Sequence, residues 1–500
     1  MEYLVTSQEM KRYDENTIEK IGIPALVLME RAALGICEEV QKACSRLGAK
    51  VCILCGTGNN GADGLAAARI LCTRGYRVDV VITGDPEKAT TQWQQQNRIL
   101  QNYAVRTGSK IPDQEYDIWI DALFGVGLSR EVTGSFRERI EQLNGKKGIK
   151  IAVDIPSGVC ADDGKILGAA VKADLTVSFG FLKRGLFFYP GCTYVGRVIK
   201  KEIGIDAVSF GENLPEMFCY TEKAADLLPE RDPGGNKGTF GKVLLAAGSR
   251  NMAGAAVLSA GSGYASGAGM VKVITPECNR LILQSTVPEA LFTPWEDSPD
   301  CVSEADLAWA DVLVVGPGLG KKPEAFKILE RMLSGSDKPL LIDADGLNLL
   351  AERSSLQEML AMQTQAGRAV VLTPHVMELS RLLKTGVPEI KKEPVAAARK
   401  LAGCLGCIVV SKDARTIICG KDGAVCLNKD GNSGMATAGS GDVLAGVLAG
   451  LLAQGMDPFK AACIGTYWHA KAGDAAAKTK GERSVSASAL IAYLAEACCF

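Results

Sequence analysis

The chain has 500 residues, and its 56 lysines and arginines almost balance its 57 aspartates and glutamates. This length allows roughly two to four domains, and the balanced charge excludes an electrostatic surface of the kind that binds nucleic acid or an anionic membrane. We therefore expect small-molecule partners. The N-terminus lacks the order of a signal peptide, and no apolar run is long enough to span a bilayer, so we expect a cytoplasmic protein.

The cysteines and histidines limit the possible metal chemistry. Seventeen cysteines are scattered along the chain, mostly in apolar segments, which is typical of reduced and buried thiols. Cys-x-x-Cys pairs begin at Cys52 and Cys404, but they lie within or just before strand-like runs, so we do not expect them to bind zinc or to act in redox chemistry. The chain has two histidines, which excludes a multi-histidine metal centre.

Short apolar runs alternate with helical patterns along much of the chain. Continuous apolar strands that alternate with helices predict parallel sheets with helices on both faces. We therefore predict an α/β fold with two tandem three-layer α/β/α domains, and ligand sites just beyond the carboxyl ends of the strands. The expected strands are residues 51–54, 78–82, 118–123, 149–154, 243–247, 312–315, 339–342, 369–372 and 408–410.

A polar stretch separates two glycine-rich halves. Between residues 204 and 238 the alternation of strands and helices gives way to a segment rich in proline, glycine and charged residues. We place the domain boundary in this stretch, with one domain over residues 1–214 and the other over residues 215–500. Because each half carries its own glycine-rich loops, we predict two catalytic domains fused in tandem.

In the first half, a glycine-rich turn at residues 55–64 follows the first long apolar run and precedes a helical pattern. A strand, a glycine turn and a helix in this order suit a nucleotide phosphate, because the start of the helix offers free backbone N–H groups. The first domain is therefore predicted to be Rossmann-like. Its glycine spacing departs from the usual dinucleotide fingerprint, and no acid closes the next strand, which disfavours a plain hydride-transfer domain.

Two later apolar runs of the first half end in loops that begin at Asp121 and Asp154. If Asn60, Asp121 and Ser157 converge, they supply one carboxylate and neutral oxygens, a hard and weakly charged set of ligands that suits a monovalent cation. Each of the three also has an ordinary structural interpretation. Asn60 could occupy a left-handed turn, Asp121 could cap a strand end, and Ser157 could form a turn.

Three motifs of the first half occur in a fixed order: Gly-Asn-Asn-Gly-Ala-Asp-Gly, Asp-Ala-Leu-Phe-Gly-Val-Gly and Asp-Ile-Pro-Ser-Gly. Together they resemble the NAD(P)H-hydrate epimerase family, over residues 1–210. The resemblance implies that Asp154 transfers protons at C6 of a hydrated nicotinamide nucleotide, and that Asn60, Asp121 and Ser157 bind potassium (K⁺). The substrate contacts that it implies are Asn59, Asn60, Gly61, Ala62, Asp63, Gly125, Val126, Gly127, Leu128, Ser129, Arg130, Glu131 and Asp154.

The most informative segment of the second half is Met-Ala-Thr-Ala-Gly-Ser-Gly-Asp-Val-Leu-Ala-Gly at residues 435–446. Its glycines lie at the start of an apolar helix, where unpaired N–H groups and the positive end of the helix dipole can hold phosphate. Asp442 beside them could take a proton from a hydroxyl that attacks this phosphate, or it could merely cap the helix. No Walker-type motif occurs, which excludes a P-loop NTPase.

Further loops of the second half would enclose a substrate at the strand ends. They read Gly-Pro-Gly-Leu-Gly, Asp-Ala-Asp-Gly-Leu-Asn and Thr-Pro-His-x-x-Glu. With the Asp442 turn they resemble the ribokinase-like superfamily, and within it the ADP- or ATP-dependent NAD(P)H-hydrate dehydratases, over residues 225–500. The resemblance implies hydrate contacts at Ala255, Gly318, His375 and Asp442, and nucleotide contacts at Lys412, Asp413, Ala414, Arg415, Thr416 and Gly441.

One position of the second half departs from the family pattern, and two others also have an ordinary structural interpretation. The entry loop has Asn236 where many members of this branch have histidine. His375 follows Thr-Pro at a strand end and could be a locally hydrogen-bonded loop former, but its surrounding motif favours a site. Lys412 could be a solvated surface charge, but its place directly after an apolar strand directs it toward the strand ends.

The two resemblances together imply a bifunctional repair enzyme for hydrated NADH and NADPH. The first domain would interconvert the R and S epimers at C6, and the second would dehydrate the S form after Asp442 activates the C6 hydroxyl for phosphoryl transfer. ADP, or ATP, is the implied donor, with Mg²⁺ to neutralise the phosphoryl oxygens, and the implied assembly is a homo-oligomer, a tetramer or larger. Two alternatives stay open: a small-molecule kinase for a vitamin or sugar hydroxyl, and a non-enzymatic nucleotide-binding module at the N-terminus.

Overall fold

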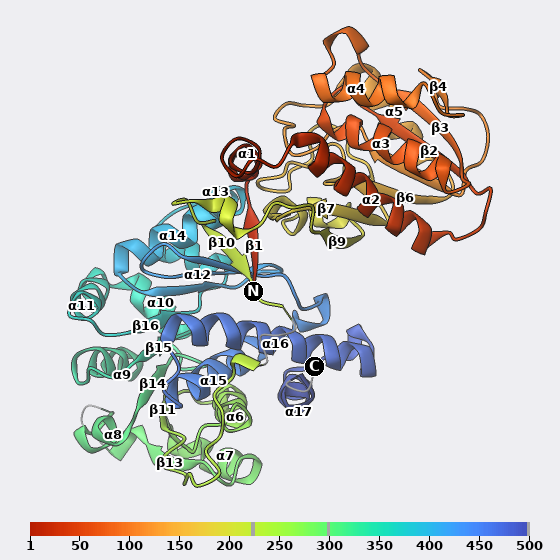
Figure 1. Ribbon diagram of the computed structural model, residues 1–500. Helices are drawn as coiled ribbons and strands as arrows, with labels where there is room; N and C mark the ends of the chain where they lie inside the picture. Colours follow the sequence, from red (N-terminus) through yellow and green to blue (C-terminus); the bar gives the residue numbers. More distant parts are fainter. Residues whose placement is uncertain (222–225, 298–300, 498–500) are drawn as a thin grey trace. The chain divides into compact units, whose positions relative to one another are not determined.

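The predicted apolar runs form two sheets of mainly parallel strands, one in each of two units of the chain (Figure 1). The computed structural model describes residues 1–221, 226–297 and 301–497. The N-terminal unit spans Glu2–Glu216 and the C-terminal unit spans Met217–Phe500, where the sequence placed a boundary after residue 214. Within the described residues, no helix has both the length and the apolar character needed to cross a membrane.

All of the predicted strands are confirmed, and no strand end is shifted by more than one residue. The prediction left out other strands, among them Leu175–Phe179 and Met270–Thr275. The first is fully buried but contains Thr176 and Ser178, and the second contains Lys272. Polar residues inside these strands interrupt the apolar runs from which strands were predicted.

The N-terminal unit is built on a parallel sheet of seven strands. They are β2 (Lys50–Cys55), β3 (Arg77–Ile82), β4 (Arg106–Gly108), β5 (Ile118–Ala122), β6 (Ile149–Val153), β7 (Leu175–Phe179) and β9 (Arg197–Lys201), while the short strands β1 (Glu2–Val5) and β8 (Leu182–Lys183) pair with each other. The order β4-β3-β2-β5-β6-β7-β9 is that of the Rossmann fold with one added strand, which confirms the predicted class. Because the order reverses between β2 and β5, ligands are expected beyond the ends of these two strands.

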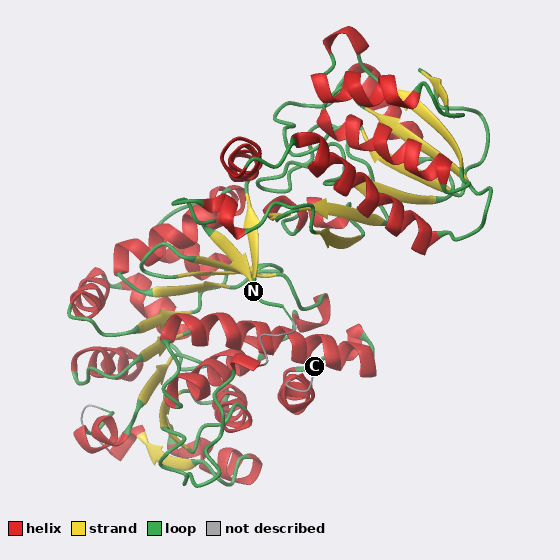
Figure 2. Cartoon of the chain, viewed as in Figure 1, coloured by secondary structure: helices red, strands yellow, loops and turns green. Residues whose placement is uncertain are grey.

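Helices cover both faces of this sheet (Figure 2). They are α1 (Ser7–Glu15), α2 (Ala25–Ala43), α3 (Asn59–Thr73), α4 (Thr91–Leu100) and α5 (Gly134–Asn144). Successive strand residues face opposite sides of a sheet. Ile53 of β2 accordingly packs in one core with α2, α3 and α4, whereas Leu54 packs in a second core with α5. The N-terminal unit thus has the predicted three layers.

The C-terminal unit is built on a second sheet, which is parallel from β13 to β17 and antiparallel in the β17-β18-β19 hairpins. Its strands are β10 (Met217–Cys219), β11 (Lys242–Ala246), β12 (Met270–Thr275), β13 (Leu291–Pro294), β14 (Val312–Val315), β15 (Leu340–Ile342), β16 (Val370–Leu372), β17 (Ile408–Ser411), β18 (Thr416–Cys419) and β19 (Val425–Asn428). The strand order β13-β12-β11-β14-β15-β16-β17-β18-β19-β10 reverses between β11 and β14.

The helices of the C-terminal unit are α6 (Ala253–Ala265), α7 (Arg280–Thr286), α8 (Glu304–Trp309), α9 (Pro323–Ser334), α10 (Asp345–Glu352), α11 (Ser354–Gln365), α12 (Val376–Leu383), α13 (Val387–Lys392), α14 (Pro394–Leu405), α15 (Ser440–Ala453), α16 (Pro458–Lys480) and α17 (Ala487–Ala497). Helices α6, α15, α16 and α17 share one buried core with the strands. Helices α9, α10, α11 and α14 lie on the other side of the row of strands (Figure 1). This arrangement gives the second predicted three-layer domain.

Helix α15, which carries Asp442, packs against α6 through small residues. A Cβ atom added at Gly446 would lie 2.0 Å from Ser262 Oγ and 2.2 Å from the Ser259 carbonyl oxygen. One turn later, a Cβ atom at Gly450 would lie 2.0 Å from Ser266 Oγ. Because no atom fits at these distances, glycine is required for the two helices to approach this closely. The approach fixes the start of α15 beside α6.

The substitution Gly446→Ala should therefore destabilise the C-terminal unit by about 1–3 kcal/mol, because the backbone of α6 must move away. Differential scanning calorimetry should show a lower Tm for one transition of the protein. Gly403→Ala in α14 is the matched control, since a Cβ atom there has no neighbour within 4 Å, and it should be neutral or stabilising by up to about 1 kcal/mol. An unchanged Tm for Gly446→Ala would contradict the close packing of α6 and α15.

Candidate active sites

The N-terminal unit has a cavity of about 920 Å³ at the place where the strand order of its sheet reverses. The loops that follow β2 and β5 supply much of its lining. Most of the predicted substrate contacts lie there, whereas Gly61, Ala62 and Glu131 are outside the lining. The predicted residues that line the cavity are Asn59, Asn60, Asp63, Gly125, Val126, Gly127, Leu128, Ser129, Arg130 and Asp154.

Two glycines hold the start of α3 against the strand ends. A Cβ atom at Gly61 would lie 1.9 Å from the Gly56 carbonyl oxygen, and one at Gly56 would lie 2.1 Å from the Leu123 carbonyl oxygen. A larger residue at either position would push the first turn of α3 away from β2 and β5. Gly61 therefore acts through packing, which brings Asn59 and Asn60 to the cavity.

Asp121 and Ser157, predicted to share a cation with Asn60, form a buried hydrogen-bond network. Ser157 Oγ donates to Asp121 Oδ1 at 2.6 Å, and the Ser157 N–H donates to Asp121 Oδ2 at 2.7 Å. The Phe124 N–H in turn donates to Ser157 Oγ at 2.8 Å. Burial raises the pKa of Asp121 to about 6, although the hydrogen bonds from Ser157 and Leu123 oppose the rise.

Asn60 lies next to this network. Its Oδ1 atom would be 3.2 Å from a Cβ atom added at Gly125, which directly follows Phe124 in the chain. The Nδ2 atom of Asn60 is buried without a hydrogen-bond partner among the described residues. Asp121 likewise has no cationic partner among them. The structure therefore brings the three predicted residues into one neighbourhood that holds an unpartnered amide and an uncompensated carboxyl group.

Asp154 directly follows β6 and lies in the left-handed region, with φ 67°. Its Oδ1 atom accepts hydrogen bonds from Lys183 Nζ and, at 3.1 Å, from the Phe179 N–H. Lys183 Nζ also donates to the Phe179 carbonyl oxygen at 2.9 Å and to Ser178 Oγ at 3.3 Å. The side chain of Lys183 is 1% exposed. A strained backbone and a buried ion pair thus fix the carboxyl group of Asp154 at the cavity.

In the C-terminal unit, Gly439 forms the turn before α15. Its φ of 88° is left-handed, and a Cβ atom there would lie 2.5 Å from Leu258 Cδ1, so the turn requires glycine. Helix α15 begins at Ser440 without a side-chain cap, which makes the capping interpretation of Asp442 wrong. The first N–H groups of α15 are therefore available to an anion.

Asp442 is half-buried in the first turn of α15. Its backbone carbonyl oxygen accepts a hydrogen bond from Ser259 Oγ at 2.9 Å, whereas its carboxyl group has no hydrogen-bond or ion-pair partner within the described ranges. Burial raises the pKa of Asp442 to about 6, and the nearby carboxylate of Asp343 adds to the rise while Lys412 opposes it. A group with these properties accepts a proton near neutral pH.

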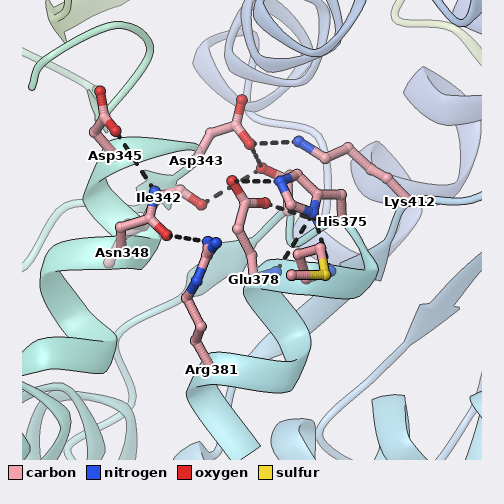
Figure 3. Close-up of polar contacts among 10 residues, drawn as sticks. Ile342, Asp343, Asp345, Asn348, His375, Glu378, Arg381 and Lys412 are labelled. Atoms are coloured by element: carbon pink, nitrogen blue, oxygen red, sulfur yellow. Dashed lines mark hydrogen bonds and ion pairs between the residues drawn. The ribbon is translucent and has the colours of Figure 1, made fainter. Parts of the chain in front are cut away.

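Lys412 forms an ion pair with Asp343 (Figure 3). Lys412 Nζ lies 2.6 Å from Asp343 Oδ1, which also accepts a hydrogen bond from Thr373 Oγ1 at 2.6 Å. Burial would lower the pKa of Lys412, but the carboxylates of Asp343 and Glu378 outweigh it and the pKa is raised. A Cβ atom at Gly441 would lie 3.3 Å from Lys412 Nζ. The lysine predicted to hold the nucleotide therefore lies beside the α15 turn, already paired with Asp343.

His375 begins α12 and caps it. Its Nδ1 atom accepts hydrogen bonds from the N–H groups of Met377 and Glu378, and Glu378 Oε2 accepts from the His375 N–H at 2.8 Å. Burial lowers the pKa of His375, with Lys412 and Arg381 adding to the effect. Burial raises the pKa of Glu378 to about 7. His375 is thus a helix cap that also lies beside Lys412, to which it forms a parallel bridge.

Asp345 and Asn348 form a second polar group near Asp343 (Figure 3). Asp345 Oδ2 accepts a hydrogen bond from the Gly320 N–H at 2.8 Å, which fixes the Gly-Pro-Gly-Leu-Gly loop. Arg381 donates to Asn348 Oδ1 at 2.8 Å. Ala344, between Asp343 and the helix, has φ 48°. The C-terminal site, like the N-terminal site with Asp154, therefore has a strained residue at the end of a central strand.

Ala255 and Gly318 lie at the reversal point between β11 and β14. A Cβ atom at Gly318 would lie 2.7 Å from the Ala255 Cβ atom, so the loop and α6 are in contact. Ala255 precedes Ser259 by one helical turn, and Ser259 is hydrogen-bonded to Asp442. Ala255 and Gly318, which are predicted to bind the hydrate, are therefore linked to Asp442 through helix α6.

The other predicted nucleotide contacts form the turn between β17 and β18. Asp413 and Ala414 are exposed, and Thr416 Oγ1 donates to the Asp413 carbonyl oxygen at 3.2 Å. Asn236 of the entry loop is also exposed and accepts a hydrogen bond from the Gly238 N–H at 2.8 Å. These segments supply backbone turns beside the site.

Four residues of the two sites were given no role from the sequence. Asp343 and Glu378 lay inside recognised motifs, so their spacing was a usable signal. Lys183 follows a strand that was not predicted, and Asp14 lies on a polar helix, where a charged residue is normally solvated. Only the fold shows that these two line the N-terminal cavity.

Two family models match the chain. One, described as NAD(P)H-hydrate dehydratase, matches residues 243–496, and one described as YjeF-related protein N-terminus matches residues 25–185. The bifunctional NAD(P)H-hydrate repair enzyme Nnr of Thermofilum pendens is 36% identical over 98% of this chain and 95% of its own length. Among solved structures, a Streptococcus mutans protein of hypothetical status is 27% identical with a TM-score of 0.50, and covers 56% of this chain and 98% of its own. An ADP/ATP-dependent NAD(P)H-hydrate dehydratase from Bacillus subtilis, co-crystallised with ATP and Mg²⁺, is 29% identical with a TM-score of 0.49, and covers 56% of this chain and 96% of its own.

Proposed function

The chain belongs to the bifunctional NAD(P)H-hydrate repair enzymes, and from this premise we propose which residues carry out its two reactions. It is an NAD(P)H-hydrate epimerase and an NAD(P)H-hydrate dehydratase. Membership in this family favours hydrate repair over the small-molecule kinase and over the non-enzymatic N-terminal module that the sequence also allowed. We assign the epimerase to the N-terminal unit and the dehydratase to the C-terminal unit.

In the proposed dehydration, Asp442 removes the proton of the C6 hydroxyl of the S hydrate. The hydroxyl oxygen then attacks the terminal phosphoryl group of the nucleotide, and the bond from that phosphorus to the bridging oxygen breaks. The C6–O bond then breaks with departure of phosphate, and C5 loses a proton to solvent as the C5–C6 double bond of the dihydronicotinamide forms. The observation that carries this assignment is the carboxyl group of Asp442, half-buried and unpartnered within the described residues, in the uncapped first turn of α15. With ADP as the donor, the products are AMP, phosphate and NADH or NADPH.

The same turn is proposed to hold the phosphates of ADP or ATP. The free N–H groups at the start of α15, with Gly441 among them, suit a phosphate group, and Lys412 lies close enough to add positive charge. We propose that the turn that contains Asp413 and Thr416 contacts the remainder of the nucleotide. Mg²⁺ would enter with the phosphates, because transferred phosphoryl oxygens need their charge neutralised.

In the proposed epimerisation, the hydrated nicotinamide occupies the N-terminal cavity. Asp154 is the assigned proton-transfer residue, supported by its place in the lining and by the lysine that fixes its carboxyl group. At C6 the hydroxyl must leave one face of the ring and return on the other, which requires proton transfer in both directions. We further propose a cytoplasmic homo-oligomer, a tetramer or larger, in which each subunit keeps both sites.

K⁺ is proposed to bind at Asn60, Asp121 and Ser157. These residues fit a weakly charged cation, since the buried carboxyl group of Asp121 meets only neutral donors within the described part of the chain, and Ser157 and Asn60 supply neutral side-chain oxygens in the same neighbourhood. A bound K⁺ would supply positive charge next to the loops that line the cavity.

The substitution Asp442→Asn should lower the rate of dehydration by at least about 100-fold, because a positioned base is lost. Epimerisation and nucleotide binding should persist in this variant. Asp154→Asn is its counterpart, and it should lower epimerisation while dehydration stays near the wild-type rate. Assays of both activities on both variants give the comparison, and equal loss of both activities in either one would contradict the assignment to separate units.

The rate of dehydration should fall as the pH decreases through about 6, the raised pKa of Asp442, because the base works only in its deprotonated form. The pH dependence of kcat/KM for the S hydrate measures this midpoint. Asp343→Asn removes a carboxylate that raises the pKa of Asp442 and leaves Lys412 to lower it. The midpoint of this variant should therefore move below 6. An unmoved midpoint would assign the ionisation to another group.

Exchange of K⁺ for tetramethylammonium at equal ionic strength should lower the Tm of one unit by roughly 2–4 °C, because a ligand of the folded state is removed. Asp121→Asn should abolish this difference. Asp113→Asn, a change at an exposed carboxylate of the same unit, is the control and should keep it. Calorimetry in the two salts is the measurement, and identical Tm values for the wild type would exclude the cation site.

A further inference from the structure

The cavity of the N-terminal unit holds more carboxyl groups than its lysine neutralises. Asp14, Asp63 and Asp154 line it together with Lys183. Lys183 forms its ion pair with Asp154, and no hydrogen bond or ion pair of Asp14 or Asp63 occurs among the described residues. One acid of the cavity is therefore paired with a cation, while two others are not.

The position of Asp63 suits an exchange of protons with a bound ring. It lies in the first turns of α3, four residues after Asn59, which also lines the cavity. This is the crevice between β2 and β5, where the Rossmann-like strand order places ligands. Asp14 lines the same cavity from α1 and does not belong to the loops that follow β2 and β5. Of the two unpartnered acids, Asp63 is thus the one beside the predicted substrate contacts.

Epimerisation at C6 needs an acid at its first step and a base at its return step. The hydroxyl leaves readily only if it is protonated as the C–O bond breaks, which requires an acid. Water that returns to C6 must lose a proton, which requires a base. Two carboxyl groups whose surroundings differ can divide these roles.

We propose that Asp63 is the general acid of epimerisation and that Asp154, positioned by Lys183, is the general base. This proposal rests on the epimerase function assigned above to the N-terminal unit. As N1 donates its lone pair to C6, the C6–O electron pair moves to oxygen, and the oxygen takes the proton of Asp63 and departs as water. The ring then has a double bond between N1 and C6 and a positive charge.

The second half of the reaction restores the hydrate. A water molecule adds to the opposite face of C6, its electron pair forms the new C–O bond, and the N1–C6 double-bond pair returns to N1. The proton that this water loses goes to Asp154, which then releases it to solvent, and solvent returns a proton to Asp63. The product is the other epimer, and no oxidant, reductant or nucleotide is consumed.

The charges around Asp63 favour its protonated form. Burial raises the pKa of Asp63 well above its ordinary value, Asp154 and Asp14 add to the rise, and Lys183 opposes it. Other charged groups of the lining lie at the surface, where solvent screens them. The charged side chains that line the cavity around Asp63 are Lys11, Asp14, Glu15, Arg130, Asp154 and Lys183.

The test uses the full-length protein without nucleotide, so that dehydration is silent and one epimer is supplied. We expect Asp63→Asn to lower kcat for interconversion by at least about 100-fold with little change in KM. The wild-type rate should fall at high pH as the acid loses its proton, and the residual rate of Asp63→Asn should lack this decline. Dehydration of the S hydrate by the same variant, with ADP present, should stay at the wild-type rate. An unchanged Tm of the N-terminal unit in calorimetry should show that this unit is folded.

Asp113→Asn is the matched control, because it changes an exposed carboxylate of the same unit that does not line the cavity. It should keep interconversion within a few-fold of the wild type. In water enriched with heavy oxygen, the wild type should place solvent oxygen at C6 of the epimer formed, as C–O cleavage requires.

Three results would overturn the proposal: near-normal interconversion by Asp63→Asn, an equal loss of interconversion in Asp113→Asn, or epimer that keeps its original oxygen. Each of these results leaves the epimerase function standing. If instead the wild-type protein does not interconvert the epimers, this unit is not an epimerase and Asp63 is not its acid.

Discussion

The ion pair between Lys412 and Asp343 decides the chemistry of the C-terminal site. Lys412 is held by Asp343 at 2.6 Å, so the nearby Asp442 has a basic neighbour but no partner of its own within the described residues. Burial then raises the pKa of Asp442, and the free first turn of α15 provides a place for phosphate beside it. The N-terminal site has a similar composition: Lys183 pairs with Asp154, and Asp63 has no partner among the described residues in the same cavity. In each unit, one buried lysine satisfies one of the neighbouring aspartates and leaves another able to exchange a proton.

The topology of the two sheets explains where these groups lie. Each sheet reverses its strand order at one place, between β2 and β5 and between β11 and β14, and loops diverge there to leave space for a ligand. Glycines let helices begin very close to these strand ends, as at Gly61 and Gly318. Strained residues, Asp154 and Ala344, occur at the ends of central strands in both units. The two units thus place acids at the carboxyl ends of parallel strands by the same means.

Much of this could be predicted from the sequence, because strand-end motifs are local. The glycine turn before Asp442 and the loops after β2, β5 and β6 were recognised from a few consecutive residues, and the strands that precede them were confirmed. The pairing of side chains could not be predicted. Lys183 and Asp154 are 29 residues apart, and Lys412 and Asp343 are 69 apart, so only the folded sheet shows which acid each lysine neutralises. Lys412 was accordingly expected to meet the nucleotide, and its ion pair was missed.

The central claim is that the unpartnered carboxyl group of Asp442 faces the reacting hydroxyl. A crystal structure of the protein with the S hydrate and a nucleotide analogue that cannot transfer its phosphoryl group tests this most directly. The account predicts a carboxylate oxygen of Asp442 within about 3 Å of the C6 hydroxyl oxygen, and the terminal phosphate at the first N–H groups of α15. A hydrate whose C6 hydroxyl contacts a different residue, with Asp442 turned away from it, would contradict the account.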